Sequence, residues 1–328
     1  MVIGASAGGV ETLKRVVANL PGDLPATVCI VLHIAPDTPS MLARILARSG
    51  PLPARAAREG DALRNGEILV APPDRHLMVE DEHVRLSVGP RENGHRPAVD
   101  VLFRSAAEAR PGRVIGVILS GTRGDGAVGL AAVKASGGGT IVQDPEEALY
   151  AGMPTTALAL VAVDAVVPSD LVADTIVAMV KGEDPPPRPK QARPTVDPSS
   201  GDPAVTVCPE CGGVLSEHLE ANVPVWECRV GHRYSPEGLV DAQAVSIESS
   251  LWVAIRALED RRRLLERMAE QCEMRGSIRS ARSFTLRAQS ARDQARAIRH
   301  ALTRAAEVSL SKTDQDDADA MMAEGGSR

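Results

Sequence analysis

Residues 1–181 predict an α/β fold, in which helices cover both faces of a doubly wound, mostly parallel sheet. Two observations support this. Short runs rich in β-branched residues alternate with segments of helical periodicity, as they do in strand–helix–strand units. Apolar residues make up 44% of the chain but aromatic residues only 2%, so we expect an aliphatic core.

Each element is predicted from a short stretch of this alternation. Buried strands are expected at residues 2–3, 27–32, 114–119 and 140–142. Helices are expected at residues 10–20, 41–48, 99–109, 127–135 and 170–180. Two further apolar runs, at residues 77–79 and 84–86, flank the turn Glu80-Asp81-Glu82, which indicates a β-hairpin inserted into the pattern.

The composition changes after residue 181, and four further segments follow. Residues 182–204 are proline-rich and predict a semi-extended linker, which should make the next module independent of the first domain. That module, residues 205–234, is predicted to be a small zinc ribbon. Two heptad-spaced apolar series around Gly276, with Ser235 as cap, predict an α-helical hairpin at residues 235–308. Residues 309–328 are polar and acidic and are expected to be disordered.

Charge and hydropathy exclude several classes of protein. The net charge of −6 gives no general attraction to nucleic acid or anionic membranes. No apolar run approaches the roughly 20 residues of a membrane span, and residues 1–4 lack the basic start of a signal peptide. We therefore expect a cytoplasmic protein without membrane insertion.

A glycine-rich turn, Gly4-Ala5-Ser6-Ala7-Gly8-Gly9, follows the first predicted strand. It fits the pattern G-x-S-x-G between a strand and a helix, where a serine projects from the carboxyl end of the strand. The Ser6 hydroxyl would lie near a helix N-terminus, whose free N–H groups can stabilise an oxyanion. Taken alone, the motif also fits a phosphate or nucleotide cradle.

Two further residues favour a catalytic serine. His33 follows the strand predicted at residues 27–32, and Asp125 lies in the loop after the strand predicted at residues 114–119. Because the carboxyl ends of parallel strands meet at one edge of the sheet, both can converge on Ser6. Each alone would be explained as a capping or turn residue, but together they indicate Ser/His/Asp catalysis. Backbone N–H groups at Ala7 and near Thr122 are the candidates for an oxyanion hole.

Three cysteines stand beside a histidine in the predicted ribbon. Cys208 and Cys211 form a CxxC pair, and Cys228 is followed four residues later by His232. These donors suit a closed tetrahedral site, which zinc favours and which would be structural. The alternative is a small β module with reduced cysteines and no metal. The serine chemistry itself is expected to need no cofactor.

Five separated motifs of residues 1–180 resemble the catalytic domain of CheB-type protein-glutamate methylesterases. They are Gly-Ala-Ser-Ala-Gly-Gly at 4–9, Leu-His-Ile at 32–34, Ala-Pro-Pro-Asp-Arg-His at 71–76, Gly-Asp-Gly at 124–126 and Tyr-Ala-Gly-Met-Pro at 150–154. The resemblance implies an enzyme that hydrolyses methyl-esterified glutamates on chemoreceptors, releasing methanol, and in many members deamidates glutamines. Carried over by motif, it implies Ser6 as nucleophile, His33 as general base and Asp125 as the residue that orients His33.

One match to this family pattern leaves a role open, and the chain departs from the pattern at two other points. His76 matches a family histidine near the site, and for it both a structural role and a substrate-side role are open. The usual Gly-Met-Gly-x-Asp-Gly is here Gly-Thr-Arg-Gly-Asp-Gly at residues 121–126, which keeps the aspartate but alters the substrate-side contacts. Typical members also carry an N-terminal receiver domain, whereas this sequence starts at its first predicted strand. The ribbon and hairpin resemble the tails of receiver-less members.

The expected partner is a methylated chemoreceptor or a similar helical signalling protein. The C-terminal helices could recruit it, and they could also join copies of this chain into a homo-oligomer. One alternative is an inactive scaffold of the same fold, which the altered loop before Asp125 would explain. A second is a nucleic-acid-binding regulator, for which the ribbon and the arginines of residues 261–304 supply charge but no interleaved aromatic set.

Overall fold

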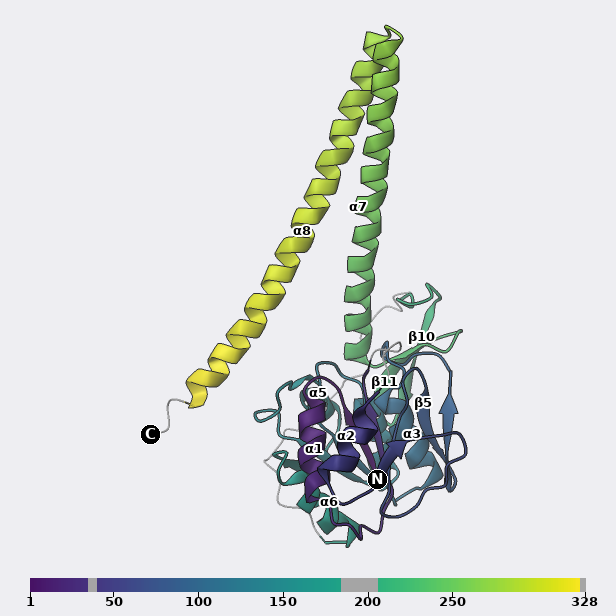
Figure 1. Cartoon of the computed structure of the whole chain (residues 1–328), viewed down its shortest axis with the longest axis vertical. Helices are drawn as coiled ribbons and strands as arrows, with labels where there is room; N and C mark the ends of the chain where they lie inside the picture. The colour runs from purple at the N-terminus through teal and green to yellow at the C-terminus, as the bar shows by residue number, and fades with distance from the viewer. Residues whose placement is uncertain (35–39, 184–205, 325–328) are drawn as a thin grey trace. The chain divides into compact units, whose positions relative to one another are not determined.

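Seven parallel strands form one sheet in the unit Met1–Ala242, the first of two compact units (Figure 1). The computed structural model describes residues 1–34, 40–183 and 206–324, with side chains as far as residue 304. The sheet order is β3-β4-β2-β1-β7-β8-β9. The strands are β1 (Val2–Ala5), β2 (Val28–Leu32), β3 (Ala54–Ala56), β4 (Ile68–Val70), β7 (Ile115–Ile118), β8 (Gly139–Gln143) and β9 (Ala165–Val167).

The order of the strands places a topological switch point between β1 and β7. From β1 the chain proceeds to β2 on one side, and from β7 it proceeds to β8 and β9 on the other. Ligand sites of open α/β sheets lie at such a point, outside the carboxyl ends of the strands. A ligand site is therefore expected at the loops after β1, β2 and β7.

Helices cover both faces of the sheet, as the doubly wound fold requires. On one face, α1 (Gly9–Asn19), α2 (Leu42–Ser49) and α6 (Val172–Val180) contribute aliphatic side chains to one core cluster. On the other, α3 (Val99–Ala109), α4 (Ala127–Ala135) and α5 (Gly152–Leu160) contribute to a second cluster. The predicted α/β class is confirmed. The core is also aliphatic as expected, with Phe103 as its main aromatic member.

The predicted inserted hairpin is also confirmed. Strands β5 (His76–Glu80) and β6 (His83–Ser87) pair antiparallel around the turn at residues 81–82. Leu77, Val79 and Val84 are buried in the same cluster as α3. The Val79 N–H also donates to Ser105 Oγ on that helix at 3.1 Å.

The ribbon, which we define as β10 (Leu215–Glu220), β11 (Val223–Cys228) and β12 (Arg233–Tyr234) with the Cys/His residues between them, belongs to the first unit. Its three strands form an antiparallel sheet. Val223 and Val225 are buried in the cluster that contains α3 and α4. The expectation that the ribbon is independent of the first domain is therefore wrong, because β11 shares that domain's core. Residues 184–205, most of the predicted linker, lie outside the described residues.

Two long helices make up the second unit, Gln243–Arg328. Helix α7 (Pro236–Met274) begins within the first unit, and α8 (Ile278–Glu324) follows a turn at Gly276 (Figure 1). Small and aliphatic side chains are buried along the hairpin, namely Ile255, Leu265, Ala269, Ala281, Ala288, Ala291 and Ala295. This confirms the helical hairpin. Among the described residues, no helix is long and apolar enough to cross a membrane.

The end of α8 differs from the prediction of a disordered tail. The helix continues to Glu324, well beyond residue 308. Residues 278–324 contain neither glycine nor proline, and alanine, the strongest helix former, recurs through them. A high density of charge does not by itself end a helix when such helix-forming residues continue.

Candidate functional site

Ser6 lies directly at the carboxyl end of β1, where the sequence predicts it. Its N–H donates to Ser120 O in the loop after β7 at 2.9 Å, and its carbonyl accepts from Gly9 N at 3.0 Å. Gly8 precedes α1 with φ of 72°, a left-handed conformation that favours glycine. This tight turn leaves the Ser6 side chain half-buried at the edge of the sheet.

His33 follows β2 at the position that Ser6 has after β1. β1 pairs with β2 so that Ala5 faces Leu32, and the next residues of the two strands are Ser6 and His33. The His33 N–H donates to Ala5 O at 3.2 Å, which extends this pairing by one residue. The structure therefore brings both predicted residues to one edge, side by side in the sheet.

His33 is held by Asp125 through one ring nitrogen. Nε2 of His33 lies 2.7 Å from Asp125 Oδ2. Nδ1, the other nitrogen, is buried and has no hydrogen-bond partner among the described residues. Because the ionised carboxylate can only accept, Nε2 carries the proton and Nδ1 keeps a lone pair. A histidine in this tautomer is ready to accept a proton through Nδ1.

Asp125 is fully buried, yet its surroundings favour the carboxylate. Oδ2 also accepts from the Val99 N–H at 2.6 Å, and Oδ1 accepts from the Asp100 N–H at 3.3 Å, both at the N-terminus of α3. Burial opposes ionisation, but the hydrogen bonds from His33 and from the Val99 N–H hold the pKa of Asp125 below its usual range. Asp125 is consequently ionised at neutral pH.

His95 is a site residue that the sequence did not reveal. Its ring stacks on His33, with 3.7 Å between ring centroids and 7° between planes. Burial, followed by the proximity of His33, lowers the pKa of His95 to about 3, so its ring is neutral and does not repel an imidazolium at His33 strongly. Its only sequence signal is a histidine in the polar stretch that precedes the helix predicted at residues 99–109.

The remaining candidates fall into two groups. His76 is only 2% exposed, and both ring nitrogens contact backbone: Nε2 meets Pro90 O at 2.9 Å and Nδ1 accepts from Ala98 N at 3.3 Å. This supports the structural role of His76, which holds the chain at the start of α3.

The N–H groups of Ala7 and Thr122, in the loops after β1 and β7, make no hydrogen bond to any described residue.

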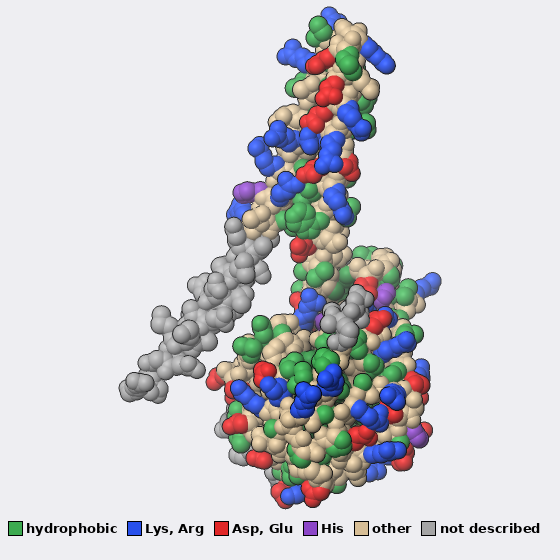
Figure 2. Space-filling view, in the orientation of Figure 1, with side chains coloured by type: hydrophobic (Ala, Val, Ile, Leu, Met, Phe, Trp, Pro, Cys, Tyr) green, Lys and Arg blue, Asp and Glu red, His purple; other side chains and the backbone are tan. Residues whose placement is uncertain are grey.

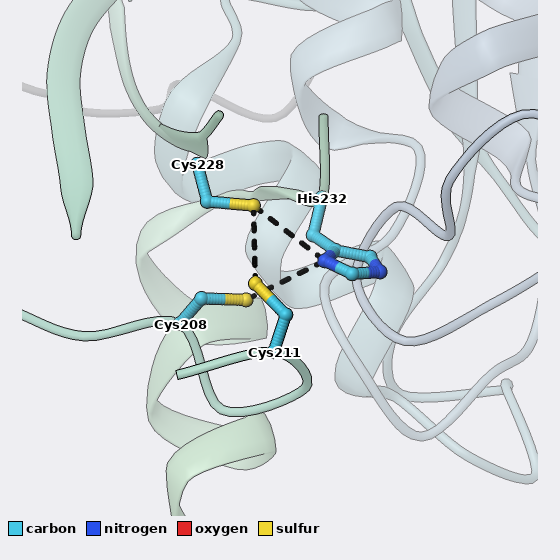
Figure 3. Close-up of side chains that lie close together, drawn as sticks. All are labelled: Cys208, Cys211, Cys228 and His232. Carbon is cyan, nitrogen blue, oxygen red and sulfur yellow. Dashed lines mark hydrogen bonds between the residues drawn. The ribbon is translucent and has the colours of Figure 1, made fainter. Parts of the chain in front are cut away.

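The four predicted metal ligands gather in the ribbon (Figure 3). Their ligand atoms all lie within 4.8 Å of one another. Sγ of Cys211 and Sγ of Cys228 are 3.6 Å apart, and Nδ1 of His232 lies 3.6 Å from Cys208 Sγ and 3.5 Å from Cys228 Sγ. Nε2 of His232 meets the Glu210 carboxylate at 3.2 Å, which fixes the ring with Nδ1 toward the sulfurs.

A parallel α/β sheet with a serine, a histidine and a buried aspartate at its switch point has the parts of a serine hydrolase. Comparison with known proteins makes the family specific. The CheB methylesterase family model matches residues 1–176, more than half of the chain. The chain belongs to the CheB methylesterase family.

Individual relatives agree with this assignment. A protein of Symbiobacterium thermophilum named protein-glutamate methylesterase/protein-glutamine glutaminase is 40% identical over 181 residues, which are 55% of this chain and 50% of that protein. An Anaeromyxobacter dehalogenans protein of the same name, number 2, is 44% identical over 170 residues, 52% of this chain and 50% of that protein. This chain thus spans about half the length of these curated relatives.

A solved structure resembles the same part of the chain. The crystal structure of the Thermotoga maritima CheB methylesterase catalytic domain superposes with a TM-score of 0.53 and 32% sequence identity. The match covers 54% of this chain and 96% of that domain. The similarity therefore includes nearly the whole of that domain and about half of this chain.

Proposed function

We propose that this protein is a serine hydrolase that removes the methyl group from glutamate methyl esters on chemoreceptor-like helical proteins, releasing methanol. The observation that carries the proposal is the state of His33. Nε2 is fixed by a buried carboxylate at 2.7 Å, and Nδ1 is left without a partner among the described residues. The histidine stands next to Ser6 at the carboxyl edge of the sheet, directly after the paired residues Ala5 and Leu32.

The residues in this arrangement account for the acylation step. His33 Nδ1 accepts the proton of the Ser6 hydroxyl as Ser6 Oγ attacks the ester carbonyl. The negative charge that forms on the carbonyl oxygen is met by the N–H groups of Ala7 and Thr122. When the tetrahedral intermediate collapses, His33 gives the proton to the departing methoxide, so methanol leaves and an acyl-enzyme remains.

Deacylation repeats these roles with water. His33 Nδ1 takes a proton from water as the water oxygen attacks the acyl carbon, and then returns a proton to Ser6 Oγ. The products are a free glutamate carboxylate and the restored serine. On a glutamine side chain the same steps release ammonia in place of methanol, which is consistent with the second activity in the relatives' names.

The test uses paired serine variants. Ser6→Ala should reduce methanol release from a methylated receptor fragment by at least about 1000-fold, since members of such a triad act as a unit. Ser136→Ala is the matched control, because Ser136 Oγ only bonds Val133 O at the end of α4. Equal methanol release by wild type and the Ser6 variant would refute the proposed function. A loss in the Ser136 variant as well would point to a folding defect.

For the ribbon, we propose a bound zinc ion held by Cys208, Cys211, Cys228 and His232. A tetrahedral ion with Zn–S bonds of about 2.3 Å needs sulfurs about 3.8 Å apart. The spacing of 3.6 Å between Cys211 Sγ and Cys228 Sγ is close to this value. Three thiolates and one imidazole close the coordination sphere, so the ion would supply structural stability and leave no position for a substrate or water.

The arginines of the hairpin do not favour the nucleic-acid alternative. Basic and acidic side chains are interspersed along the α7–α8 hairpin (Figure 2). Four arginines of this unit pair with neighbouring carboxylates, in the pairs Arg262–Glu266, Arg263–Asp260, Arg296–Asp293 and Arg299–Glu259. On the face that Figure 2 shows, this mixture of charge is typical of a solvated helix.

A further inference from the structure

Asn93 joins the ribbon to the proposed triad. It is 4% exposed and lies in the loop before α3. Its Nδ2 donates to Asp125 Oδ1 at 3.0 Å and to Asp100 Oδ2 at 2.8 Å. Its Oδ1 accepts from the Ser235 N–H, directly after the ribbon, at 2.8 Å. One buried amide thus connects the carboxylate that orients His33 with a segment more than a hundred residues later.

The two carboxylates that receive this amide are not equivalent. Burial, and then the charge of Asp125, raise the pKa of Asp100 well above its usual range. Asp125 keeps its pKa low because His33 and the N-terminus of α3 bind its charged form. Asn93 Nδ2 therefore bridges two carboxyl groups whose pKa values are shifted in opposite directions. Losing Asn93 would leave Asp125 beside Asp100 without that donor.

The ribbon holds Asn93 by its backbone as well. The Asn93 N–H donates to Arg233 O at 2.8 Å, and Arg233 N donates to Arg91 O at 3.4 Å. A Cβ at Gly238, in the first turn of α7, would lie 2.2 Å from Asn93 Oδ1, so only glycine allows this approach. The Ser235 hydroxyl caps α7 by accepting from the Gly238 N–H at 3.1 Å. Asn93 is enclosed by backbone from both sides of residue 235.

Residues 233–235, which bond Asn93, are linked to two of the proposed metal ligands. His232 directly precedes Arg233, whose carbonyl accepts from Asn93. Tyr234 is 1% exposed, and its hydroxyl lies 3.4 Å from Cys208 Sγ. The two residues that bond Asn93, Arg233 and Ser235, thus lie within three residues of the proposed ligand His232. Release of His232 and Cys208 from an ion would loosen β12 and the adjoining Ser235, which make the two contacts to Asn93.

We infer that the metal-loaded ribbon is a positioning element of the esterase, which acts through Asn93 to hold Asp125 and His33 in register with Ser6. The inference rests on the proposed function. Zinc would take no part in the ester hydrolysis itself. The rate of that reaction would nevertheless depend on the zinc ion bound in the ribbon. Asn93 is a positioning residue, because it touches neither Ser6 nor the imidazole of His33 by any hydrogen bond between described residues.

A coupling experiment on the full chain tests this inference. Hydrolysis of a small methyl ester and zinc content are measured for wild type, Asn93→Ala, His232→Ala and the double variant. Asn93→Ala and His232→Ala should each lower kcat on the order of tenfold with KM little changed. The double variant should lose hardly more than either alone, because effects along one path are not additive. His218→Ala is the matched control, since His218 is an exposed ribbon histidine on β10.

Chelation of the wild-type protein is a second arm that needs no substitution. Removing zinc should lower kcat similarly, and added zinc should restore it, whereas Asn93→Ala protein should respond little to either treatment. If the wild-type protein is active and its kcat does not change on chelation, the inference is wrong. It is also wrong if chelation lowers kcat by the same factor in the wild type and in the Asn93→Ala variant. An inactive wild type, or a Ser6→Ala variant as active as wild type, is a different result that refutes the proposed function itself.

Discussion

Asp125 controls which nitrogen of His33 is basic, because it accepts the Nε2 proton at 2.7 Å. Replacing it by Asn presents an amide that can donate to Nε2, which would move the ring proton to Nδ1 and remove the base from Ser6. Asp125→Asn should therefore lower kcat by about 1000-fold or more while KM changes little. His33→Ala should match Ser6→Ala. Steady-state kinetics of methanol release check this, and a variant that chiefly raises KM would contradict the role of Asp125.

His95 provides a prediction about pH and stability. Its folded pKa of about 3 lies below the ordinary histidine value of about 6.5. Between these two values the unfolded chain binds a proton at His95 that the folded chain does not, so stability falls as pH decreases below about 6.5. The loss due to His95 should approach about 1.4 kcal/mol per pH unit.

The variant His95→Phe isolates this contribution. Phenylalanine keeps an aromatic ring against His33 but has no proton to gain, and Nε2 of His95 has no partner among the described residues to be lost. Urea unfolding at pH 7 and pH 5 should show a smaller loss of stability for the variant than for wild type. An unchanged pH dependence would show that His95 is not the group that titrates.

At the scale of elements, zinc bound in the ribbon should stabilise the catalytic domain as well as the ribbon. Freshly prepared, reduced protein should contain about one zinc per chain, held by the cluster of Figure 3. Because Val223 and Val225 of β11 are buried in the core with α3, chelation should lower the unfolding temperature of the catalytic domain too. Differential scanning calorimetry with and without chelator checks this. Loss of a small separate transition, with the main one unmoved, would contradict the shared core.

The main elements could be predicted because their signals are local. The helices at residues 99–109 and 127–135 are found at the predicted positions, and the inserted hairpin follows its alternating apolar runs. Three short strands, β3, β4 and β9, and helix α5 were not assigned. Each strand has only three residues, too few for a period-two pattern to show.

The site could be predicted only where a motif marks it. Ser6, His33 and Asp125 each follow a strand, and the topology of a parallel sheet brings them to one edge. Asn93 and His95 lie in a polar loop that no periodicity describes, and their role comes from contacts with residues far away in the sequence. The docking of the ribbon was missed for the same reason, because a proline-rich linker says nothing of where the next module packs.

At the scale of the whole molecule, the chain divides after Ala242. The first unit contains the proposed catalytic residues and the ribbon, and the second contains the helical hairpin. Beyond this point Val245 and Trp252, which are seven residues apart on one face of α7, are exposed, and so is the adjacent Val253. We propose that the hairpin recruits the methylated partner, since an exposed apolar helix face suits the docking of another helix. A homo-oligomer formed through the same helices is the competing proposal.

A chain cut after Ala242 tests recruitment while it keeps the ribbon. It should hydrolyse a small methyl ester at the wild-type rate, because all residues of the proposed site and of the ribbon are retained. On a full-length methylated receptor it should be slower, on the order of tenfold or more, since linked binding raises the effective substrate concentration. Higher activity on both substrates would make the hairpin an inhibitor. Light scattering of both chains decides whether the helices also form an oligomer.

The central claim is that Ser6 is the nucleophile. Mass spectrometry of the full chain after reaction with a fluorophosphonate ester tests it most directly, because this reagent modifies serines that are activated by a neighbouring base. We predict a single adduct on Ser6, loss of methanol release in proportion to the adduct, and no adduct in the His33→Ala variant. An adduct on another residue, or undiminished methanol release by protein fully modified at Ser6, would contradict the account.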